Sequence, residues 1–119
     1  MTASPVVYDF IIYQGATFSQ LITYTDSSNV AVDLSGYTAS MQVRNRKSSS
    51  TSLADFTTEN GRITLNSSGE ILITMSATDT AALTSCGGVY DLELTETSSG
   101  AVIRLLEGQM AFNLDVTRT

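Results

Sequence analysis

The chain has 119 residues, of which 42% are hydrophobic and 15% are charged, and it contains no histidine. This length fits one domain that can bury a core of its own. A net charge of −6 argues against a nucleic-acid-binding surface, and the absence of histidine excludes a Ser–His–Asp triad, a Cys–His nucleophile and zinc sites that need histidine.

A single cysteine, Cys86, excludes a disulfide within the chain, and we expect it to be a small buried or turn residue. The first residues, MTASPVV, show neither the basic region nor the apolar region of a secretory signal. No apolar run approaches the length of a membrane span. We therefore expect a chain that folds in a reducing cytoplasm and binds neither a membrane nor a nucleic acid.

The N-terminal segment divides into an arm, residues 1–7, and the start of a single β-sandwich domain, residues 8–118. The arm has no pairing pattern of its own, and its proline keeps it extended, which suits contact with another chain. A frayed terminus is the alternative. Aromatic residues close to it are typical of cores or interfaces. The candidate interface residues are Pro5, Val6, Val7, Tyr8 and Tyr13.

The stretch YDFIIYQGATFSQLITYT, residues 8–25, predicts the first two strands of the domain. Its one break is Gln14-Gly15-Ala16, where Gly15 permits a bulge or a change of sheet. Apolar residues alternate with polar ones here and in most later segments, which indicates sheets with one buried face. The predicted core comprises Phe18, Ile22, Met41, Ile73, Tyr90, Leu92, Phe112 and Leu114.

Turn residues separate the later strands. Gly69 and Gly100 lie in short polar connections that predict hairpins, each glycine supplying a positive φ. The basic cluster of Arg44, Arg46 and Lys47 is interpreted as a solvated strand end followed by an exposed loop. An edge strand is expected at residues 53–57.

One segment, SATDTAALTSCGG, does not alternate. Ser76 has the side chain of an N-cap, Asp79 falls in the first turn, and Gly87 follows the apolar residues. The pattern predicts one short helix within residues 77–85, with an irregular loop as the alternative.

About seven to eight short strands with regularly spaced turns predict an all-β fold, an antiparallel β-sandwich of immunoglobulin-like type. A barrel is the alternative. Asp91 and Glu93 face the same side of one strand, as a glycosidase pair would, but they suit a solvated sheet face better. Neither a calcium-loop pattern nor a glycine-rich phosphate loop occurs, so we predict no catalytic residues, no metal site and no cofactor.

Several stretches occur together in a recognisable order: YDFIIYQGATF, VDLSGYTASMQVR, GRITL, GEILITMSATDTAAL, GVYDLELT and GAVIRLLEGQMAFNLDVTR. They resemble a family of small bacteriophage virion proteins, which are related in pattern to the immunoglobulin-like N-terminal domain of upper-baseplate proteins. The likeness covers almost the whole chain, from Tyr8 to Arg118. Its motifs are structural, so they specify the family better than an activity.

The resemblance implies a non-enzymatic structural protein of the virion that is assembled in the host cytoplasm. The implied role is a tail- or baseplate-associated adaptor, present in multiple copies, that contacts tail, baseplate or fibre subunits. The alternatives are a capsid decoration protein and a carbohydrate-binding module. A carbohydrate-binding module requires a row of exposed aromatic residues, whereas a virion subunit requires broad contact surfaces lined by hydroxyl side chains.

Overall fold

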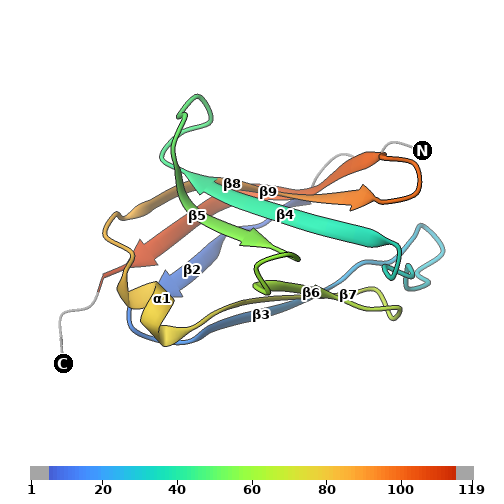
Figure 1. The fold of residues 1–119 in the computed structure, drawn as a ribbon, viewed down its shortest axis with the longest axis horizontal. Coiled ribbons are helices and arrows are strands. Elements are labelled where there is room, and N and C mark those ends of the chain that lie inside the picture. The colour runs from blue at the N-terminus through green and yellow to red at the C-terminus, as the bar shows by residue number, and fades with distance from the viewer. Residues whose placement is uncertain (1–5, 115–119) are drawn as a thin grey trace.

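The structure is a computed structural model that describes residues 6–114, and it consists of two β-sheets packed face to face (Figure 1). Sheet A has six strands: β1 (Val6–Val7), β2 (Phe10–Tyr13), β4 (Tyr37–Arg44), β5 (Ser52–Thr57), β8 (Gly87–Glu96) and β9 (Val102–Asn113). Sheet B has three strands: β3 (Phe18–Thr23), β6 (Ile63–Leu65) and β7 (Glu70–Met75). One short helix, α1 (Ala77–Ala81), connects β7 to β8.

The predicted immunoglobulin-like β-sandwich is confirmed, but sheet A is mixed rather than purely antiparallel. Its order is β1-β9-β8-β4-β5, and β2 also pairs with β9. Both β1 and β2 run parallel to β9, while the other pairs in the two sheets are antiparallel. The alternation of apolar residues does not distinguish these cases, because a half-buried strand has the same period whichever way its neighbour runs.

Strands β1 and β2 together form one interrupted edge strand. Val6 pairs with Leu106 and Phe10 pairs with Met110, so the register along β9 is the same before and after the interruption. The end of the predicted arm, Val6 and Val7, therefore belongs to the sandwich of its own chain. Counting β1 and β2 as one interrupted strand gives eight strands, within the predicted range.

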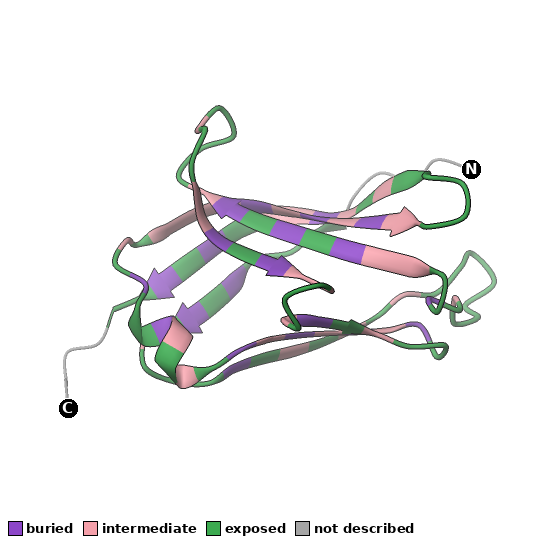
Figure 2. Cartoon of the chain, viewed as in Figure 1, coloured by how far each residue is buried: buried purple, intermediate pink, exposed green. Residues whose placement is uncertain are grey.

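The core lies between the two sheets, and buried and exposed residues alternate along most strands (Figure 2). Most of the predicted core is confirmed as buried: Phe18, Met41, Ile73, Tyr90, Leu92 and Phe112. Ile22 is only partly buried. The prediction for Leu114 is wrong, because β9 ends at Asn113 and the side chain of Leu114 is 39% exposed.

The predicted helix is present but shorter than expected. The Ser76 hydroxyl accepts a hydrogen bond from the backbone N–H of Asp79 at 3.2 Å, as predicted for an N-cap. The helix ends at Ala81, and the prediction that Gly87 terminates it is wrong. Gly87 instead begins β8 with φ 95°, and a Cβ there would meet the backbone oxygen of Met110 at 2.0 Å.

Helix α1 is attached to the turn between β2 and β3, where the chain changes sheet. The hydroxyl of Thr80 donates to the Ala16 carbonyl at 2.9 Å and accepts from the Gly15 N–H at 3.0 Å. The Gln14 amide donates to the Leu83 carbonyl at 2.8 Å. Gly15 has φ 82°, so the change of sheet predicted at this glycine is confirmed.

Candidate functional site

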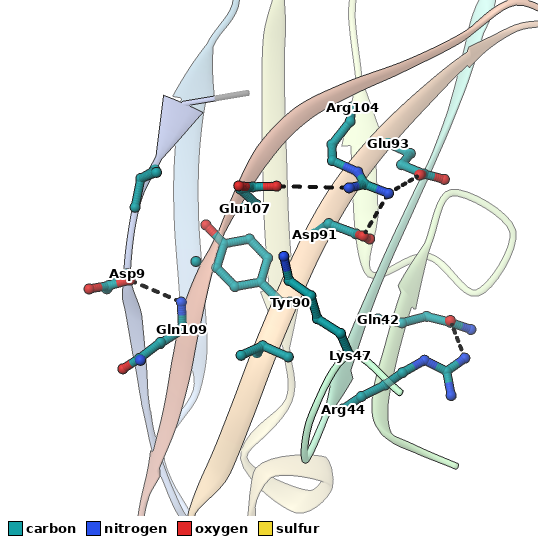
Figure 3. A pocket seen from close by; sticks show the side chains of 13 residues that line it. Asp9, Gln42, Arg44, Lys47, Tyr90, Asp91, Glu93, Arg104, Glu107 and Gln109 are labelled. Carbon is teal, nitrogen blue, oxygen red and sulfur yellow. Dashed lines mark hydrogen bonds and ion pairs between the residues drawn. The ribbon is translucent and has the colours of Figure 1, made fainter. Parts of the chain in front are cut away.

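The outer face of sheet A carries a shallow basin of about 700 Å³ (Figure 3). Four carboxylates and three basic side chains line it: Asp9, Asp91, Glu93, Glu107, Arg44, Lys47 and Arg104. They come from β4, β8, β9, the loop after β4 and the interruption between β1 and β2. Charged side chains thus converge from several strands on this concave surface, so it is a candidate site for chemistry.

Arg104 forms ion pairs with three carboxylates at the centre of this basin. Its guanidinium lies 3.5 Å from the carboxylate of Asp91, 3.6 Å from that of Glu93 and 3.8 Å from that of Glu107. Figure 3 shows the guanidinium between these carboxylates. The side chains are partly exposed, so each contact contributes about 0–1 kcal/mol. Asp91 and Glu93 are thus bridged by a cation, which fits the interpretation of this strand as a solvated sheet face.

The basic cluster predicted at the end of a strand lies at one side of the basin. Arg44 is the last residue of β4, and its guanidinium donates to the Ser49 carbonyl at 3.0 Å and to the side chain of Gln42 at 2.7 Å. Arg46 and Lys47 are exposed in the loop that follows. The predicted solvated strand end is confirmed.

Three residues that lie side by side on adjacent strands hold the edge strand of sheet A against β9. Tyr90 on β8 pairs with Gly108 on β9, and Gly108 lies beside Tyr8. The Tyr90 hydroxyl donates a hydrogen bond to the carbonyl of Tyr8, across the position where Gly108 has no side chain. Burial raises the pKa of Tyr90, and the nearby charge of Asp9 raises it further.

Asp9 occupies the interruption between β1 and β2. Its carboxylate accepts a hydrogen bond from the backbone N–H of Gln109 at 2.9 Å, in the place of a main-chain carbonyl. A Cβ on Gly108 would lie 2.8 Å from this carboxylate and 2.4 Å from the oxygen of Tyr8. Gly108 is therefore required for the close approach of the edge strand to β9.

The predicted interface residues fall on two different faces. Val7 and Tyr13 point outward from sheet A together with Ile11, and these side chains are 71%, 56% and 51% exposed. Val6 and Tyr8 point the other way, toward an apolar groove beside β3. Pro5 lies outside the described residues. The structure thus brings Val7 and Tyr13 to one surface and separates them from Val6 and Tyr8.

The residues that sequence reasoning missed are Ile11, Asp9 and Gly108. Ile11 is predicted to lie in a strand but is not among the predicted interface residues. Its alternation with the buried Phe10 and Ile12 puts it on the outer face. Gly108 interrupts an otherwise continuous strand pattern. An isolated glycine in a strand often marks a close approach of another backbone, and this signal could have located the contact.

Residues 6–114 show neither a metal-binding cluster nor a membrane-spanning helix. In this part of the chain no group of three or more His, Cys, Asp or Glu residues could hold a metal ion. The same residues contain no helix that could span a membrane. Cys86 lies in the loop before β8 and is exposed, so of the two expected positions, buried or in a turn, the buried one is excluded.

Comparisons with known proteins support the fold alone. No protein-family model matches the chain, and no curated protein matches it. The NK cell receptor Nkp44 is similar in structure with a TM-score of 0.52 and 12% sequence identity, covering 93% of this chain and all of that one. The extracellular domain of the voltage-gated sodium channel beta4 subunit gives a TM-score of 0.45 and 13% identity, covering 98% of each chain. The first likeness agrees with the immunoglobulin-like β-sandwich described above.

Proposed function

We propose that this protein is a structural subunit of a bacteriophage particle, where it connects tail or baseplate components through protein–protein contacts and without catalysis. The family resemblance of the sequence suggests the virion, with assembly in the host cytoplasm. The structural observation that carries the proposal is the outward row of Val7, Ile11 and Tyr13 on the edge strand of sheet A.

This row has the properties of a contact surface. It combines two aliphatic side chains and one tyrosine, and aromatic residues are enriched at protein interfaces. It lies on the edge strand of sheet A, so no other described strand stands between these side chains and a partner. Exposed apolar edges promote association and are therefore usually covered in the working assembly.

The charged basin favours the non-catalytic role. Asp91 and Glu93 share Arg104 as a common partner at 3.5 and 3.6 Å, so both carboxylates already have a cationic partner within the chain. A sugar-stacking platform is also disfavoured. Tyr8 and Tyr13, the two strongly exposed aromatic residues among those described, point to different faces and do not form a row.

The proposal is tested with particles of a phage that encodes this chain. Mass spectrometry of purified particles should detect the chain, and electron cryomicroscopy should place it at the tail or baseplate in multiple copies. Ile11→Lys should prevent incorporation, because it places a charge in the apolar row. Val30→Lys changes a loop residue that is also exposed and should leave incorporation normal. Particles that lack the chain would refute the proposal, and density on the outer shell would favour a capsid decoration protein.

A further inference from the structure

The second exposed apolar surface of the molecule is a groove of about 360 Å³ that runs beside β3. Its walls come from β1, β3, β9 and the residues that directly follow β1 and β3, and they include Val6, Tyr8, Leu21, Ile22, Tyr24 and Leu105. No charged residue lines it within the described part of the chain. The groove is separate from the outward row of Val7, Ile11 and Tyr13. The edge-strand residues that line the groove, Val6 and Tyr8, point to the opposite face.

A bulge in β9 shapes one wall of the groove. Leu92 pairs with Leu106 and Glu93 pairs with Arg104, so Leu105 is an extra residue without a partner on β8. The extra residue breaks the alternation of side chains. As a result two consecutive leucines, Leu105 and Leu106, both line the groove.

The other wall is a free strand edge. Sheet B has the order β3-β7-β6, so β7 pairs with one edge of β3 and no described strand pairs with the other. The Tyr24 N–H donates to the Gly69 carbonyl at 2.8 Å, on the side of β7. Hydrogen bonding alternates along an antiparallel strand, so the backbone groups of Leu21 and Thr23 point away from β7.

The fold shows which element would complete this edge. Immunoglobulin-like sandwiches of the constant type place their first strand beside the second, in a sheet of four strands. Here the first strand, β1 and β2, pairs with β9 in the opposite sheet. No strand within residues 6–114 therefore covers the edge of β3 in that way, and Ile22 and Tyr24 are only partly buried.

The remaining edges of the two sheets are protected. At β5 the side chains of Asn60 and Arg62 donate to the Asp55 carbonyl at 3.1 and 2.8 Å. Strand β6 has three residues, and the β1–β2 edge is interrupted by the charged Asp9. Short strands, charges and interruptions are the usual means by which edges avoid pairing. Strand β3 has six residues, with no charge, no proline and no bulge.

We propose that β3 and its groove bind an extended segment of a partner protein, which adds as a further strand to sheet B. The segment is uncharged and alternates apolar with small polar residues, because the groove is uncharged and one face of the added strand would cover Ile22 and Tyr24. Its backbone pairs with the outward groups of Leu21 and Thr23. This is strand addition of the kind used in donor-strand complementation. The proposal does not depend on the role in a phage particle.

The test uses the full chain and a capped seven-residue peptide of alternating threonine and valine. In isotope-labelled protein, hydrogen exchange by NMR should show that the amides of Leu21 and Thr23 exchange fast alone and become protected when the peptide binds. The same peptide with N-methyl groups on alternate amides keeps its side chains but loses the donors for pairing. It should not bind.

Two variants with matched exposure locate the site. Leu21→Lys introduces a charge at a side chain that is 52% exposed, and it should weaken peptide binding about tenfold or more. Ile11→Lys changes a side chain that is 51% exposed on the outer row, and it should leave peptide binding unchanged. Loss of particle incorporation in Ile11→Lys together with normal peptide binding separates this site from the proposed function.

Three results would overturn the proposal. The first is that the peptide does not bind while the β3 amides exchange fast. The second is protection of these amides in the free chain at all concentrations, which would show that the chain covers its own edge. The third is protection that rises with protein concentration without peptide, which would assign the edge to a second copy.

Discussion

The centre of the sandwich and its side along β3 differ in how completely they are closed. Leu92, Met41 and Ile73 are fully buried, whereas Ile22 and Tyr24 are only partly buried although they also face inward. The centre of sheet A is closed because β4 and β8 each have a neighbour on both sides, while among the described strands β3 pairs with β7 alone. The closed centre stabilises the fold, whereas the open side along β3 is available for association, and substitutions in the two regions test this division.

The largest effect is expected at the centre. Leu92→Ala removes a fully buried side chain that cannot be replaced by solvent, so the free energy of unfolding should fall by about 2–5 kcal/mol. Ile22→Ala should cost less, because this side chain is already partly exposed. Denaturant unfolding of both variants measures the difference. Equal losses would show that the side along β3 is as closed as the centre.

Gly108→Ala should have the next largest effect, because it forces the edge strand formed by β1 and β2 away from β9. The new Cβ would meet the backbone oxygen of Tyr8 at 2.4 Å, and backbone cannot move aside as a flexible side chain can. We expect a loss of about 1–3 kcal/mol in the free energy of unfolding, together with faster amide exchange in β1 and β2. Gly36→Ala is the control, since a Cβ there meets no atom within 4 Å. An unchanged exchange rate in β1 and β2 would contradict the role assigned to Gly108.

The sequence predicts the closed centre better than the open side. Alternation places Met41, Ile73 and Leu92 on inward faces, and these positions depend only on the local period of two. The hairpins at Gly69 and Gly100 are equally local, and both glycines have the positive φ that was predicted. These predictions are correct because each of them depends only on residues that are close together in the sequence.

The features of the edges could not be predicted in the same way. Pairing of Val6 with Leu106 joins residues 100 positions apart, and nothing near Val6 specifies it. The consequence of that pairing is the free edge of β3, so the groove beside Ile22 was not foreseen either. The site was predicted as a list of residues at the N-terminus, and only the structure divides Val7 and Tyr13 from Val6 and Tyr8.

Tyr90→Phe tests the link between the centre and the edge strand. It removes the hydrogen bond to the Tyr8 carbonyl and leaves the ring in place, so the free energy of unfolding should fall by about 0.5–1.5 kcal/mol. Tyr13→Phe, at an exposed ring, is the control.

The pH dependence gives a second measure of the same residue. The pKa of Tyr90 is raised in the folded chain, mainly by burial, above the ordinary value of 10.0. Above pH 10 the unfolded chain therefore loses this proton more readily, and the stability of the wild type should fall as the pH rises. The Tyr90→Phe variant should lack this part of the alkaline loss. If the stabilities of the wild type and of Tyr90→Phe fell in parallel above pH 10, Tyr90 would not be buried and neutral in the folded chain.

The smallest effect is expected at α1, which closes one end of the sandwich. Arg62 lies 2.9 Å from the carboxylate of Asp79, and this hydrogen bond lowers the pKa of Asp79 below 3.8. A lowered pKa means that the contact stabilises the folded chain above pH 3.8 and loses its effect as the pH falls through the folded value. Asp79→Asn should therefore be slightly less stable than the wild type at neutral pH, and the two should converge below about pH 4. Asp55→Asn, at an exposed side chain without an ion pair among the described residues, is the control for the loss of a surface carboxylate. A difference between Asp79→Asn and the wild type that stays constant down to pH 2 would show that the charge of Asp79 does not stabilise this end of the fold.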